Sequence, residues 1–142
     1  MSTRFQEVSF RVRYAETDRM GVVYHANYLV WMEIGRVEFC RAAGIRYRDV
    51  EDQDGLALAV VEAQCRFRSP AHYDDEVTVK TWVSAVRRRM VEFSYEMRGG
   101  QQVLATGMTK HVWVGRDFRP ASLPAKYHSA FGLEPAEAAH PR

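Results

Sequence analysis

Residues Arg13 to Tyr28, RYAETDRMGVVYHANY, bring an aspartate, a histidine and three tyrosines that could do chemistry into one short stretch. Asp18 lies in a polar loop, and Gly21 and a short apolar step lead from it to an apolar helix expected from about Asn27. A helix N-terminus presents unpaired backbone N–H groups that favour negative charge. Asp18 could therefore cap a turn, or it could attack a substrate carbonyl or activate water while the N–H groups bind the oxygen.

Composition restricts the class of protein. The chain has 142 residues, of which 46% are hydrophobic, enough for one domain with a real core. Its formal charge is only +2, from 20 basic and 18 acidic residues, which argues against a nucleic-acid-binding protein. Cys40 and Cys65 lack CxxC spacing, so we expect free thiols and a cytoplasmic location. The sequence shows neither a signal-peptide pattern nor a membrane-length apolar run, so we expect no export and no membrane insertion.

Several common catalytic signatures are missing from the sequence. It contains no GxSxG elbow, P-loop, GxGxxG or HExxH motif. Its five histidines are scattered without the spacing of metal ligands, so we expect no metal site.

Residue patterns predict the elements that must position Asp18. Alternation predicts a strand over residues 4–14, and apolar residues at helical spacing predict one long helix over residues 27–43. Four more strands are predicted over residues 58–67, 76–86, 90–98 and 103–114, with a hairpin at Gly99 and Gly100. A short helix is expected over residues 124–131. We expect a single domain over residues 1–133 and a flexible tail over residues 134–142.

This order of elements predicts an α+β fold, in which an antiparallel sheet of about five strands wraps around one long central helix. Gly35, in the middle of the helix, is expected to permit the close approach of another backbone. Such a sheet has free edges, which favours dimerisation through an edge strand.

The pattern Y-x-x-T-D-x-x-G-V-V-Y-H-A-N-Y, from Tyr14 to Tyr28, closely resembles the signature of the 4-hydroxybenzoyl-CoA thioesterase family. Within the family it is most similar to the bacterial acyl-CoA thioesterases encoded with the Tol-Pal envelope system. The resemblance continues through VEAQCRFRSPAHYDDEVTV and RPASLP and so covers almost the whole chain.

The resemblance implies a hotdog fold, with subunits paired into dimers and then into tetramers as dimers of dimers. It also implies hydrolysis of an acyl-CoA, or of an acyl-carrier-protein thioester, to a free acid without a cofactor. Asp18 would be the nucleophile or general base, and the backbone N–H of His25 would contribute to the oxyanion hole. Thioester hydrolysis suits this small apparatus because the coenzyme A thiolate is a good leaving group.

Further residues are candidates for the same site. Tyr24 and the His25 ring are candidate catalytic groups, although Tyr24 could simply pack and the ring could make a structural bond. Tyr14, Asn27 and Tyr28 are candidates for substrate binding, and Asn27 is expected to act mainly as the helix N-cap. The run Arg87, Arg88 and Arg89 could bind the phosphates of coenzyme A or be a solvated turn, with Arg66 and Arg68 as secondary candidates.

Two other functions remain open at this level. The chain could be a non-catalytic module that binds acyl-CoA or an acyl carrier, although such a module has no need of a carboxylate beside the thioester. It could also be a hotdog dehydratase, which would need a paired histidine and acid. Glu33 and Glu38, on the predicted helix, rank below Asp18 as catalytic carboxylates. The sequence does not define the acyl group.

Overall fold

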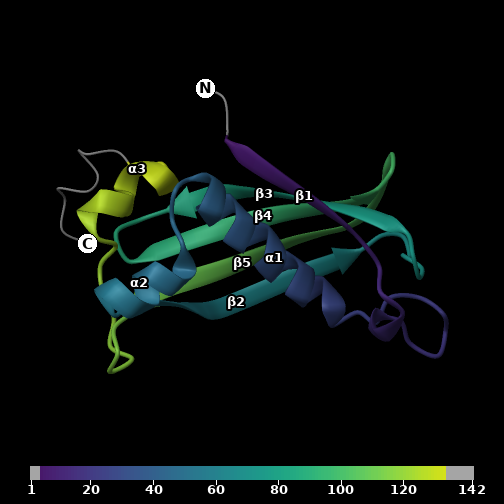
Figure 1. The fold of residues 1–142 in the computed structure, drawn as a ribbon, viewed down its shortest axis with the longest axis horizontal. Helices are drawn as coiled ribbons and strands as arrows, with labels where there is room; N and C mark the ends of the chain where they lie inside the picture. Colours follow the sequence, from purple (N-terminus) through teal and green to yellow (C-terminus); the bar gives the residue numbers. More distant parts are fainter. Residues whose placement is uncertain (1–3, 134–142) are drawn as a thin grey trace.

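The computed structural model describes residues 4–133, so the tail expected over residues 134–142 lies outside the described residues. Within this part, five antiparallel strands form one sheet in the order β1-β3-β4-β5-β2 (Figure 1). The strands are β1 (Phe5–Arg11), β2 (Ala57–Phe67), β3 (Glu76–Val86), β4 (Met90–Gly99) and β5 (Gln102–Val114). The predicted five-stranded antiparallel sheet is therefore confirmed.

Alternation along the strands creates the buried face of the sheet. Val77 and Val79 of β3, and Val91 and Phe93 of β4, are fully buried, whereas the residues between them are partly exposed. The β4–β5 hairpin turns at Gly100, which has a φ of 63°. The first strand is shorter than predicted, because the chain leaves the sheet after Arg11 and forms a short 3-10 helix, η1 (Tyr14–Glu16).

The longest described helix, α1 (Asn27–Ala42), lies across the buried face of the sheet, where it packs mainly on β1 and β3 (Figure 1). Its buried side chains recur at helical spacing and include Tyr28, Trp31, Met32, Phe39 and Cys40. Hydrophobic burial of this stripe is the main force that fixes the helix on the sheet.

The helical part of the chain differs from the predicted single long helix. Besides α1, residues 4–133 form α2 (Tyr47–Asp54), η2 (Ala125–Tyr127) and α3 (His128–Phe131), the last two within the predicted short helix. The α2 helix was not predicted, because its sequence is polar and Val50 is its one buried residue. It ends at Gly55, whose φ of 68° suits a left-handed C-cap. No helix in the described range is long and apolar enough to cross a membrane.

Gly35 is the point of closest approach between α1 and the sheet. A Cβ at this position would lie 2.9 Å from Val79 Cγ1 and closer than van der Waals contact to Thr81 Oγ1. The predicted close approach is therefore made to side chains of β3.

We predict that Gly35→Ala destabilises the fold. The gain of about 1 kcal/mol in helix propensity is outweighed by overpacking against β3, which typically costs about 1–3 kcal/mol. Urea unfolding followed by circular dichroism measures the difference. Glu33→Ala, at an exposed position of the same helix, is the matched control and should change the unfolding free energy little. An unchanged or raised midpoint for Gly35→Ala would contradict the packing described here.

Candidate active site

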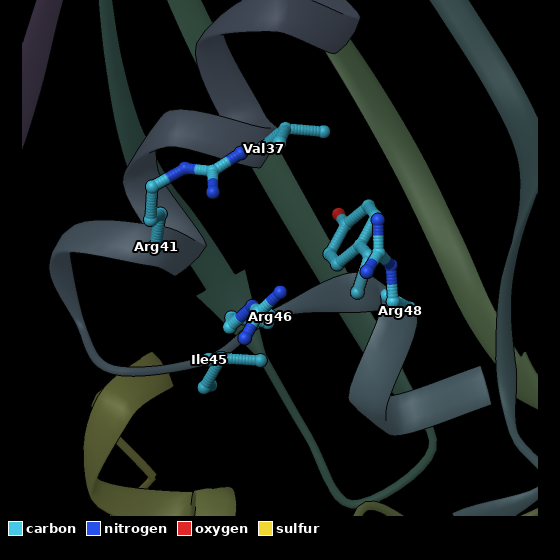
Figure 2. A pocket seen from close by; sticks show the side chains of 6 residues that line it. Val37, Arg41, Ile45, Arg46 and Arg48 are labelled. Carbon is cyan, nitrogen blue, oxygen red and sulfur yellow. The ribbon is translucent and has the colours of Figure 1, made fainter. Parts of the chain in front are cut away.

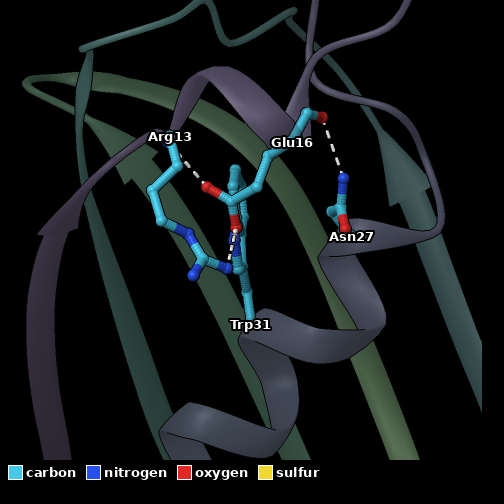
Figure 3. Close-up of polar contacts among 4 residues, drawn as sticks. All are labelled: Arg13, Glu16, Asn27 and Trp31. Carbon is cyan, nitrogen blue, oxygen red and sulfur yellow. Dashed lines mark hydrogen bonds and ion pairs between the residues drawn. The ribbon is translucent and has the colours of Figure 1, made fainter.

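A buried carboxylate, that of Glu16, organises the loop that precedes α1 (Figure 3). Its Oε1 accepts a hydrogen bond from the backbone N–H of Arg13 at 2.7 Å, and its Oε2 accepts one from the Trp31 indole N–H at 2.9 Å. The Arg13 guanidinium lies 3.4 Å from Oε2. Glu16, which is 5% exposed, thereby connects the segment just after β1 to the second turn of α1.

These contacts also set the charge state of Glu16. Burial by itself raises the pKa of this carboxyl group, but the hydrogen bonds from the Arg13 backbone and Trp31, with the Arg13 charge, outweigh it and hold the pKa below 4.5. The fold therefore contains an ionised carboxylate at neutral pH. The residue patterns gave no sign of this role, because a glutamate in a polar loop looks like any solvated side chain.

Asp18 lies at the start of a tight turn. Its backbone N–H donates to the Val22 carbonyl and the Gly21 N–H donates to the Asp18 carbonyl, both at 2.9 Å. Gly21 has a φ of 82°, a conformation that side chains disfavour. The Asp18 carboxylate accepts the Met20 N–H through Oδ1 at 2.8 Å. Its Oδ2 has no hydrogen-bond partner within residues 4–133. One carboxylate oxygen is therefore fixed by the Met20 N–H, and the other is available to a ligand.

The start of α1 lies next to this turn. The expected N-cap role of Asn27 is wrong, because Ala26 is the N-cap and the Asn27 side chain instead donates to the Glu16 carbonyl at 2.8 Å (Figure 3). The Tyr24 N–H donates to the same carbonyl. The backbone N–H groups of His25 and Ala26 have no acceptor in the described part of the chain. Two donors therefore remain at the end of α1 that carries partial positive charge.

Asp18 and His25 line one cleft of about 340 Å³. Its other walls come from the loop before α1 and the first turn of α1 (Val22, Val23 and Tyr28), and from the end of β2 and the segment that follows (Phe67, Arg68, Ser69 and Pro70). Its aromatic side chains contact one another, with ring centroids 5.1 Å apart for Tyr28 and Phe67 and 6.4 Å apart for His25 and Phe67. The cleft thus combines a carboxylate with an aromatic wall.

Arg68, a secondary candidate in the sequence, lines this cleft. Its guanidinium makes no hydrogen bond or ion pair within residues 4–133, and Asp18 forms no ion pair there either. The Arg68 backbone is fixed by a hydrogen bond of 2.8 Å from its N–H to the Leu104 carbonyl. The cleft therefore contains a guanidinium that is free to meet a ligand.

Of the other predicted residues, Tyr28 is buried in the cleft wall, and Tyr24 and Tyr14 are more exposed. The Tyr24 ring lies 4.6 Å from the His25 ring. Tyr14 is 77% exposed and its ring lies edge-on to the Tyr73 ring. It lines a second hollow, which Asp18 also lines. The structure thus gathers Asp18, His25, Tyr24 and Tyr28 at one place and leaves Tyr14 beside it.

The run Arg87, Arg88 and Arg89 is not near the cleft in this chain. It forms the β3–β4 turn, at the end of β3 opposite to the Asp18 loop (Figure 1). The 11 residues of β3 at about 3.3 Å each separate the two ends by about 35 Å. Arg88 is held at this end, where its carbonyl accepts the Leu123 N–H.

Comparisons with known proteins agree with this architecture. Residues 12–131 match the family described as the Thioesterase-like superfamily, and the chain belongs to that family. YneP of Bacillus subtilis is 38% identical over 77% of this chain and 80% of its own length. The chloroplastic acyl-acyl carrier protein thioesterase ATL3 of Arabidopsis thaliana is 33% identical over 91% of this chain and 68% of its own length.

A solved structure gives the same result for the fold. The DHNA-CoA thioesterase from Staphylococcus aureus superposes with a TM-score of 0.86 at 31% identity, covering 89% of this chain and 88% of that one. The fold is therefore of the hotdog type found in thioesterases.

We predict that Glu16→Gln destabilises the fold by about 1–3 kcal/mol, because a neutral amide leaves donors in this buried site imperfectly paired. A carboxyl group with a lowered pKa stabilises the fold above its unfolded pKa, and this contribution is lost as pH falls through the folded value. Wild-type stability should therefore fall as pH drops below about 4.5, and the variant should lose part of that dependence. Chemical denaturation from pH 3 to 7 measures both effects.

Glu7→Gln, at an exposed position of β1, is the control and should leave the curve unchanged. Equal pH dependence in Glu16→Gln and the wild type would show that folding does not lower the pKa of Glu16.

Proposed function

We propose that this protein is an acyl-CoA thioesterase, which hydrolyses a thioester to a carboxylic acid and coenzyme A. One observation carries the proposal. Asp18, with a free carboxylate oxygen Oδ2, and His25, whose N–H group is unbonded like that of Ala26 at the start of α1, line one cleft. Membership of the thioesterase-like family supports it.

In this proposal the thioester carbonyl lies in the cleft with its oxygen toward the start of α1. Asp18 either attacks the carbonyl carbon or removes a proton from an attacking water. The N–H groups of His25 and Ala26 stabilise the negative charge that develops on the oxygen. Collapse of the intermediate expels the coenzyme A thiolate. If water attacked, the acid is formed directly; if Asp18 attacked, the product is an anhydride with Asp18, which a water molecule then hydrolyses to the acid and the free carboxylate. Asp18 approaches the carbon from the cleft, and its fixed Oδ1 orients the free oxygen.

The aromatic wall suggests what the cleft accepts. Tyr28 and Phe67 offer flat apolar faces to the acyl group, and the Arg68 guanidinium offers donors to oxygen atoms of the substrate. The carrier is coenzyme A in this proposal, and an acyl-carrier protein is the alternative. A non-catalytic binding module or a dehydratase has weaker support, since neither requires the free carboxylate oxygen beside the oxyanion donors.

We predict that Asp18→Asn lowers kcat by about 100-fold or more, with a small effect on KM, because the amide keeps the shape of the turn but removes the attacking or basic oxygen. Release of coenzyme A from a panel of aliphatic and aromatic acyl-CoA substrates, and of their acyl-carrier counterparts, measures the effect. Glu33→Gln, an exposed carboxylate on α1, is the control and should retain full activity.

If Glu33→Gln lost activity and Asp18→Asn retained it, the catalytic carboxylate would be Glu33 on α1 and not Asp18. Absence of turnover of every panel member by the wild type would favour the binding module. A single turnover in ¹⁸O-labelled water distinguishes the two roles of Asp18. If Asp18 is the nucleophile and water attacks its carboxyl carbon, the first acid released carries ¹⁶O from Asp18. If Asp18 is a general base, the first acid released carries ¹⁸O from the attacking water.

We further propose that the protein dimerises through β2. This edge strand of 11 residues has a free hydrogen-bonding side, and Val60 and Val61 on it are 50% and 55% exposed. A long apolar edge of this kind favours pairing with a second strand.

We predict that Val61→Lys converts the protein to a monomer, because a charge at the paired edge must be desolvated. Light scattering after size-exclusion chromatography measures the mass. Gln6→Lys on β1, the opposite edge, is the control. A dimer that survives Val61→Lys and dissociates with Gln6→Lys would assign the interface to β1.

A further inference from the structure

A further cavity lies where α1 ends and α2 begins, at the opposite end of α1 from the Asp18 turn. Its volume is about 140 Å³, and its walls are Val37, Arg41, Ile45, Arg46, Tyr47 and Arg48. Figure 2 shows Arg41 on α1, Arg46 on the connecting loop and Arg48 on α2 around this cavity. The 16 residues of α1 at about 1.5 Å each span about 24 Å, so the cavity is separate from the Asp18 cleft.

The lining of this cavity carries three guanidinium groups and no acidic side chain. Arg41 is paired with Glu38, Nε to Oε1 at 3.4 Å, in an ion pair that is open to solvent. The guanidinium groups of Arg46 and Arg48 make no ion pair or hydrogen bond within residues 4–133. Like charges around one small space repel each other, and an anion between them removes that cost.

The backbone adds to the positive character of the cavity. Arg46 is the N-cap of α2 and supplies no side-chain acceptor to the first turn. The N–H groups of Tyr47 and Arg48 have no acceptor in the described residues. Val37, Ile45 and Tyr47 contribute the apolar part of the lining, while the three arginines are exposed to solvent.

We propose that this cavity is a binding site for a phosphate group. The planar fork of arginine matches phosphate oxygens, and three such forks can neutralise a dianion, whereas one bidentate arginine already satisfies a carboxylate. The phosphate is either the free inorganic ion or a phosphate carried on a nucleotide such as coenzyme A. The proposal does not depend on thioester hydrolysis, because the site lies at the other end of α1.

Isothermal titration calorimetry of the full chain tests the proposal, with sodium phosphate and coenzyme A as separate ligands at constant ionic strength set by chloride. We expect Arg46→Gln and Arg48→Gln each to weaken binding at least tenfold. Arg119→Gln is the matched control, because it removes the same charge from a loop side chain paired with Asp117 outside the cavity. It should leave the affinity unchanged. Arg48→Lys, which keeps the charge and loses the fork, should weaken binding by less than Arg48→Gln.

If both ligands bind and the Arg46 and Arg48 variants weaken both, the free phosphate ion is enough to fill the cavity. If these variants weaken only the binding of coenzyme A, the cavity holds a phosphate carried on a nucleotide. The proposal is overturned if neither ligand binds the wild type, if Arg46→Gln and Arg48→Gln leave the affinity for both ligands unchanged, as binding of coenzyme A at the Asp18 cleft alone would, or if Arg119→Gln weakens binding as much as they do. Thermal unfolding without ligand confirms that each variant is folded. If Arg46→Gln fails this check, the two Arg48 variants and the control still decide the outcome.

Discussion

The ionised side chain of Glu16, enclosed by protein on almost every side, is the contact on which the candidate site depends. A buried charge is costly unless hydrogen bonds compensate it, and here a backbone N–H, an indole N–H and a guanidinium do so. Two of these donors belong to Arg13, just after β1, and the third to Trp31 on α1. The carbonyl of Glu16 accepts from Tyr24 and Asn27, so one residue fixes both the turn that carries Asp18 and the start of α1.

Packing of α1 on the sheet completes this arrangement. The backbone of α1 approaches β3 closely at Gly35, and Trp31, which contacts Glu16, is fully buried one turn earlier. A shift of α1 along the sheet would therefore move Trp31 away from Glu16 and the first N–H groups away from Asp18. The relative position of Asp18 and the first N–H groups of α1, on which the proposed oxyanion binding rests, thus depends on the core as well as on the loop.

Local patterns were sufficient for the strands, because alternation and β-branched residues mark each of them and the Gly100 turn fixes the hairpin register. They were insufficient for α2, which buries only Val50 and is stabilised by its Gly55 cap. In the site, the motif around Asp18 could be recognised from the sequence. The burial of Glu16 and the position of Arg68 in the cleft could not be predicted, since both arise from contacts between segments far apart in the sequence.

The cleft takes its carboxylate from one segment and part of its wall from another, the stretch from Phe67 to Pro70 after β2. The second segment carries none of the hydrogen bonds that hold Asp18 in its turn. The two halves can therefore diverge separately during evolution. Exchange of residues 67–70 among homologous enzymes would give a compact library for redirecting selectivity while the reacting groups stay as they are.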